Sequence, residues 1–141
     1  MPQDPPPGGT RPDWATSAGW ALGPVEVAAR RLQTAFHGGG VLVAADHGDD
    51  PARDDAADPA TDLIAACGAL IVWHEGAPAP RGYTRAEAEL RSAGAVFRNA
   101  AFAFRGLVEA EPDQRAARAD ACEAMLTQGQ HHVDAFHRLT R

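Results

Sequence analysis

Residues 84–107, TRAEAELRSAGAVFRNAAFAFRGL, carry the clearest periodicity in the chain. Apolar side chains recur there in alternating steps of four and three, at Ala86, Leu90, Ala93, Phe97, Ala100, Phe104 and Leu107. This spacing places them on one face of an α-helix. Thr84 and Glu87 have the spacing of a capping box, which predicts where the helix begins. We therefore expect a long helix here, with Phe97 and Phe104 in the protein core.

A second long helix is predicted to follow. Pro112 suits the first turn of a helix. The apolar line behind it consists of Ala121, Cys122, Met125, Leu126, Gly129, Val133, Phe136 and Thr140. At 1.5 Å per residue, both helices would be about 40 Å long. Together they predict a long C-terminal helical hairpin.

Two shorter helices are expected before the hairpin. Pro24 begins a pattern that ends at the glycines 38–40, and Asp58-Pro59 is a cap and first-turn pair. The stripe after Pro59 consists of Leu63, Ile64, Cys67, Leu70, Ile71 and His74. These helices would measure only about 20 and 26 Å. The fold class expected is all-α, an antiparallel bundle of three to four helices, with residues 41–45 open between a strand and a helical extension.

The composition divides the chain into two parts. Residues 1–23 are rich in Pro and Gly, which predicts a disordered leader. The leader contains Trp14 and Trp20, and burial of either ring would fasten it to the domain or to a partner. Residues 24–141 are expected to form the helical bundle domain, with an acidic loop at 46–58.

Length and charge exclude several classes of protein. The 141 residues suit one domain. The net charge is −6, and all 13 basic residues are arginine, which argues against nucleic-acid binding through net charge. The longest apolar run, residues 65–73, is far shorter than the roughly 20 residues of a membrane span. No secretory signal or disulfide framework is recognisable, so a cytoplasmic location is expected.

The predicted helix lengths also suggest a partner. A hairpin of about 40 Å would extend beyond its shorter neighbours and leave an apolar strip uncovered. Such a strip is normally buried by a second copy or by another protein. We therefore expect a homodimer, a larger homo-oligomer or a complex with another protein.

One row of arginines is a candidate binding site. Arg91, Arg98 and Arg105 are spaced by seven residues, so they lie on one side of the helix, with Phe102 beside them. Their guanidinium groups could hold the carboxylates of a facing helix, a phosphate-bearing ligand or the acidic loop. The alternative is a solvated face, or one with internal salt bridges to Glu87 and Glu109.

The histidines suggest a possible metal site. His131 and Asp134, and then Asp134 and His137, are three residues apart, which suits ligands on one helix face. A metal-dependent four-helix bundle would need further ligands from other helices, for which His74 and Glu75 are the candidates. A structural role for these side chains is the competing interpretation, and no cofactor is expected.

Residues 30–37, RRLQTAFH, resemble the Arg–polar–spacer–His pattern of HEPN ribonucleases. The resemblance covers eight residues, and Arg31 stands where that family usually has Asn, Asp or His. It implies a small all-helical enzyme in which Arg31 and His37 activate a ribose 2′-hydroxyl and stabilise the scissile phosphate, usually across a dimer interface.

The function expected from the sequence is that of a non-enzymatic interaction or accessory protein. It would associate with itself or bind a partner protein through its long helical hairpin. Cys67 and Cys122 lie on apolar stripes, which indicates buried thiols rather than nucleophiles. The alternative is a small all-α enzyme or ligand-binding bundle, either HEPN-like or metal-dependent.

Overall fold

The protein is a bundle of long helices. A computed structural model describes residues 13–37 and 51–141, with the backbone alone at 35–37, 51–58 and 108. Its helices are α1 (Trp14–His37), α3 (Pro51–Gly76), α4 (Thr84–Val108) and α5 (Pro112–Leu139). No strand occurs within the described ranges, and the predicted all-α bundle is confirmed. The undecided stretch 41–45 lies outside the described residues.

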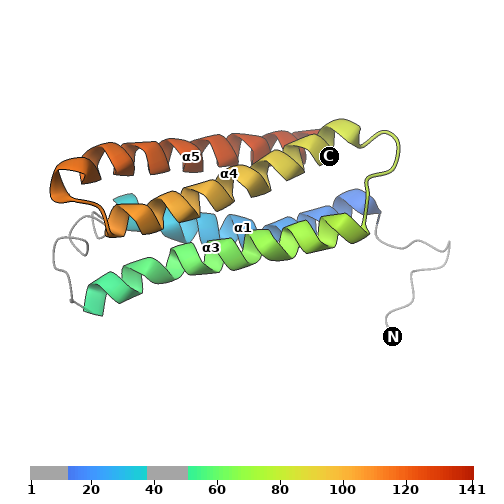
Figure 1. Cartoon of the computed structure of the whole chain (residues 1–141). Coiled ribbons are helices and arrows are strands. Elements are labelled where there is room, and N and C mark those ends of the chain that lie inside the picture. Colours follow the sequence, from blue (N-terminus) through green and yellow to red (C-terminus); the bar gives the residue numbers. More distant parts are fainter. Residues whose placement is uncertain (1–12, 38–50) are drawn as a thin grey trace.

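The helices lie side by side, and each runs opposite to the one before it (Figure 1). In chain order, α1 packs on α3, α3 on α4, and α4 on α5. Side-chain contacts agree with the reversal. Trp14, the first residue of α1, binds the Ala77 carbonyl just after the end of α3, and Arg105, late in α4, binds Thr61 in the first half of α3.

The core follows the apolar pattern of α4. All seven residues of the predicted stripe are buried, and Phe97 and Phe104 are 1% and 0% exposed. The line predicted for α5 is confirmed at Cys122, Leu126, Gly129, Val133 and Phe136, which are buried. Ala121 is exposed, and Met125 and Thr140 are half-buried. The core face of α5 is therefore narrower than predicted.

The first helix begins earlier than predicted. The predicted disordered leader includes residues 14–23, but α1 begins at Trp14 and continues through Pro24. The Thr16 N–H donates to Asp13 Oδ1 at 2.9 Å, which caps the first turn. Leu22 is fully buried, so the apolar pattern extends upstream of the proline. The rest of the predicted leader, 1–12, lies outside the described residues.

The predicted acidic loop is also corrected in part. Helix α3 begins at Pro51, so the backbone of 51–58 is helical, whereas 46–50 lie outside the described residues. Pro51 takes the first-turn position expected for Pro59, which instead lies inside the helix. Alanines at 52, 56 and 57 favour helix in this acidic stretch.

These two extensions remove the predicted difference in length. Helices α1, α3, α4 and α5 contain 24, 26, 25 and 28 residues. The α4–α5 hairpin does not extend far beyond its neighbours, so the expectation of an uncovered apolar strip for that reason was wrong.

The predicted capping box of α4 does not form. Tyr83 is the N-cap residue, and no side-chain hydrogen bond caps the helix. The Glu87 carboxylate instead accepts a hydrogen bond from the Ala79 N–H at 3.1 Å and lies 2.7 Å from His74 Nε2. Glu87 therefore ties the α3–α4 connection to the start of α4. Helix α5 begins at Pro112, as predicted.

Aromatic rings close one end of the bundle. The Trp14 Nε1–H donates to the Ala77 carbonyl at 2.7 Å. The Trp14 ring lies 6.0 Å from Trp73, 5.6 Å from Tyr83 and 6.3 Å from Phe136, measured between centroids. Trp14 thus fastens the start of α1 to the other helices, as one tryptophan was expected to do.

Within the described residues, no helix combines the length and the hydropathy needed to cross a bilayer.

Candidate functional site: the α3–α4 face

The predicted arginine row lies on the surface of α4. Arg91, Arg98 and Arg105 are all exposed. Cζ of Arg98 is 5.6 Å from the centroid of the Phe102 ring, which is itself 47% exposed. A guanidinium stacked on an aromatic ring is held in place by the ring's negative face. The row is therefore separate from the core line through Phe97 and Phe104.

A groove of about 420 Å³ runs between α3 and α4 beside this row. Its walls are Ile71, His74 and Glu75 from α3 and Arg91, Ala95, Arg98 and Asn99 from α4. Ile71 is 38% exposed and its neighbour Val72 is 69% exposed. Val72 lies about three turns after Thr61, so it faces the same side of α3 as the residue that binds Arg105.

We call this surface the α3–α4 face. It consists of Ile71, Val72, Arg91, Ala95, Arg98, Phe102 and Arg105. It combines exposed apolar side chains with guanidinium groups, a composition common in protein interfaces. The spacing of the arginines predicted their row. Ile71 was predicted on the apolar stripe after Pro59 but is exposed, and Val72 was not singled out, because the pairing of α3 with α4 is not encoded in either helix alone.

The arginines of the face form no close ion pair within the described part of the chain, although the charge of Arg91 acts on Glu87. No ion pair there involves Arg91, Arg98 or Arg105, so the predicted alternative of salt bridges to Glu87 and Glu109 is not observed. Arg105 donates from Nη2 to Thr61 Oγ1 at 3.0 Å. The face therefore presents three guanidinium groups on a chain whose net charge is −6, with the Glu75 carboxylate in the groove wall beside them.

One end of the groove is bounded by a histidine–carboxylate contact. The hydrogen bond with His74 lowers the pKa of Glu87, and the bond from the Ala79 N–H and the positive charges of His74 and Arg91 lower it further. Partial burial opposes this effect. His74 and Glu87 side chains are 20% and 19% exposed, so the contact is largely shielded from water.

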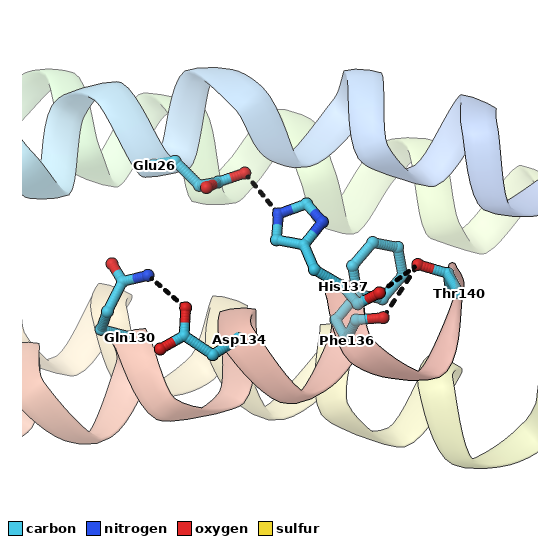
Figure 2. Close-up of polar contacts among 6 residues, drawn as sticks. All are labelled: Glu26, Gln130, Asp134, Phe136, His137 and Thr140. Atoms are coloured by element: carbon cyan, nitrogen blue, oxygen red, sulfur yellow. Dashed lines mark hydrogen bonds and ion pairs between the residues drawn. The ribbon is translucent and has the colours of Figure 1, made fainter.

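The structure does not assemble the predicted metal ligands. His74 is bound to Glu87, and His137 Nε2 lies 3.2 Å from Glu26 Oε2 of α1. Asp134 accepts a hydrogen bond from Gln130 Nε2 at 3.0 Å, in another direction from His137 (Figure 2). His131 is exposed. Among the described residues, no three His, Cys, Asp or Glu side chains converge as a metal site requires.

Histidines instead link neighbouring helices. His74–Glu87 joins α3 to α4, and His137–Glu26 joins α5 to α1. A further pair, which was not predicted, joins His132 Nδ1 of α5 to Glu89 Oε1 of α4 at 2.6 Å. The carboxylate partners come from other helices, so spacing along α5 could not identify them.

The residues of the HEPN-like pattern are only partly described. Arg31 Nη1 donates to Asp62 Oδ2 of α3 at 3.1 Å, and both side chains are more than half exposed. His37 is the last residue of α1, and its side chain lies outside the described residues. Arg31 thus has a partner in the fold, and its pairing with His37 stays a prediction.

Both cysteines are buried, as predicted. Burial raises the pKa of each thiol, Cys67 and Cys122, to about 12. The Cys122 thiol donates to the Ala100 carbonyl, with Sγ and O 3.3 Å apart. These thiols stay protonated at neutral pH and pack in the core.

Comparison with protein-family models, with curated proteins and with solved structures gave no match to this chain.

Proposed function

We propose that this chain is a non-enzymatic interaction protein, which binds a second copy of itself or another protein through the α3–α4 face. The observation that carries the proposal is the exposure of Ile71, Val72 and Phe102 at 38%, 69% and 47% beside an arginine-lined groove. Burying such side chains is favourable by about 25 cal/mol per Å² of apolar surface. Adjacent guanidinium groups would fix the orientation of the partner.

This surface differs from the hairpin that the sequence favoured. The large exposed apolar side chains of the described residues are Trp20 and Val27 in α1, Ile71 and Val72 in α3, and Phe102 in α4. Helix α5 contributes none of them. The proposal therefore moves the interaction from the α4–α5 hairpin to the side of α4 that packs on α3.

The histidines and Arg31 support a non-enzymatic interpretation. His74, His132 and His137 each hold two helices together through a glutamate. Arg31 similarly links α1 to Asp62 of α3. Three of the side chains proposed for metal binding or catalysis, Arg31, His74 and His137, therefore connect helices of the bundle.

Substitution of Phe102 tests the proposal. Phe102→Asp places a charge at the centre of the α3–α4 face, and Val27→Asp is the matched control on an exposed apolar residue of α1. We expect sedimentation velocity to show self-association, or affinity purification to show a retained partner, that Phe102→Asp abolishes and Val27→Asp preserves. A monomer whose retained proteins are the same for both variants would contradict the proposal.

A further inference from the structure

We infer that the α3–α4 face binds the outer face of α5 from a second copy of this chain, in a head-to-tail arrangement. The inference rests on the proposed function and names its partner. Its basis is a second row of charges. Asp113, Asp120 and Asp134 lie at seven-residue intervals on α5, with Thr127 in the remaining position, and all four side chains are exposed.

The two rows match in sign and spacing. Residues seven apart on a helix are separated by about 10 Å along its axis. Arg91 and Arg105 are therefore as far apart as Asp120 and Asp134, at about 21 Å. The span is too long for a single small anion and suits a carboxylate-bearing helix. A guanidinium also binds a carboxylate through two parallel hydrogen bonds, which adds geometric specificity.

The spacing further suits two packed helices. On a straight α-helix, a row of residues spaced by seven shifts around the helix axis by about 20° per heptad. A partner helix that crosses at an angle of about +20° stays in contact with such a row. The facing surface of α5 permits close packing, because Ala116 and Ala124 are small and exposed beside its aspartates. Packing against α5 would bury the exposed apolar side chains of Phe102 and Val72.

The two rows lie on opposite sides of the bundle. On α4, Arg91 is one turn after Glu87, which faces α3. On α5, Asp134 lies on the side near α1; Figure 2 is viewed with α5 and α1 in front and α3 and α4 behind. One copy therefore cannot pair its own rows. It would offer the arginines to one neighbour and the aspartates to another, which produces a chain or a ring rather than a two-fold dimer.

Charge reversal in trans provides the test. The first variant is Arg91→Glu/Arg105→Glu, and the second is Asp120→Arg/Asp134→Arg. Each variant alone opposes like charges across the interface, so each should associate about tenfold more weakly than the parent, or worse. In an equimolar mixture both interfaces regain opposite charges, and association should return. Sedimentation velocity over a concentration and salt series measures all three samples.

A control with the same change in net charge as the first variant is Arg30→Glu/Arg85→Glu, at two exposed arginines outside both the α3–α4 face and α5. It should associate like the parent, and thermal melting should show that every variant is folded. If charge reversal prevents folding, Arg98→Gln and Asp120→Asn replace the variants, and each should weaken association. The parent should also form species larger than a dimer, and raised salt should dissociate them.

Other outcomes overturn the inference without removing the proposed function. Folded variants whose mixture stays monomeric would show that α5 is not the partner. If Phe102→Asp abolishes association but neither charge-reversal variant weakens it, the α3–α4 face is the interface and α5 is not its partner. A parent that is monomeric throughout rejects the second copy, and the proposed function then depends on the partner test with Phe102→Asp.

Discussion

Gly129 of α5 lies against the ring of Phe97 in α4, so closely that a Cβ at position 129 would be 2.6 Å from Cε1 of the ring. The ring cannot retreat without disturbing the core, because Phe97 is 1% exposed. Glycine inside a helix normally destabilises it by about 0.5–1 kcal/mol relative to alanine. Its presence here reflects the close packing of the two helices.

Alanine at position 129 should therefore destabilise the protein. Overpacking against Phe97 costs about 1–3 kcal/mol, which outweighs the gain in helix propensity. Gly68 of α3 is the matched control, because a Cβ there would meet no atom within 4 Å. Urea unfolding should show that Gly129→Ala lowers the free energy of unfolding and Gly68→Ala raises it by up to about 1 kcal/mol. Equal effects of the two substitutions would contradict this packing.

Truncation of the α4 phenylalanines should separate core from surface. Phe97→Ala and Phe104→Ala should each lower the free energy of unfolding by about 3–5 kcal/mol, since each empties a buried site. Phe102→Ala removes a ring that is 47% exposed and should change stability by about 0.5 kcal/mol in the isolated monomer. Dilute samples keep association from contributing to the measurement. A near-parental melting temperature for Phe97→Ala would mean that the core face of α4 is misplaced.

The core face of α4 could be predicted from the sequence because its signal is local. Seven apolar residues repeat at helical spacing, and neither Pro nor a run of charges interrupts them. In α1 and α3 the same signal extends across Pro24 and Pro59, which were interpreted as helix starts. A proline removes one backbone hydrogen bond, a cost that packing of the whole helix can exceed. Local rules therefore placed these two boundaries too late.

The candidate site was only half predictable. The arginine row follows from spacing within one helix, whereas the groove needs Ile71 of α3 placed beside Ala95 of α4. The metal hypothesis failed for a related reason. Spacing along α5 shows which side chains share a side of that helix, but Glu26 and Glu89, which bind its histidines, belong to other helices.

Loss of Trp14 should open one end of the bundle. Trp14→Ala removes the hydrogen bond to the Ala77 carbonyl and the ring contacts with Trp73, Tyr83 and Phe136, and should cost about 3 kcal/mol. Trp20→Ala is the control, because its ring is 67% exposed. Hydrogen exchange should show faster exchange at the start of α1 only for Trp14→Ala. Matching exchange in the two variants would mean that Trp14 does not anchor the helix.

The two cysteines should resist thiol reagents while the protein is folded. Burial raises their pKa to about 12, and the thiolate is the reactive form. An aromatic disulfide reagent at neutral pH should modify neither Cys67 nor Cys122 in native buffer and both in denaturant. Rapid native labelling of either residue, located by mass spectrometry, would show that its site opens without global unfolding.

Protonation of Glu87 should make the protein less stable in acid. Hydrogen bonds from the His74 ring and the Ala79 N–H lower the pKa of its carboxyl below the ordinary value of 4.5, so the folded state favours the ionised form. The resulting stabilisation is complete above the pKa of the unfolded chain and disappears as the pH falls through that value to the lower pKa of the folded state. Glu87→Gln removes this titration, so its free energy of unfolding should be lower than the parent's near neutral pH and converge toward it as the pH falls below the ordinary value of 4.5. Glu75→Gln, one residue after His74 and exposed, serves as the control and should keep the parent's acid-dependent loss. Urea unfolding at several pH values measures all three proteins. A constant difference between Glu87→Gln and the parent across the acid range would mean that the carboxylate does not contribute through its charge.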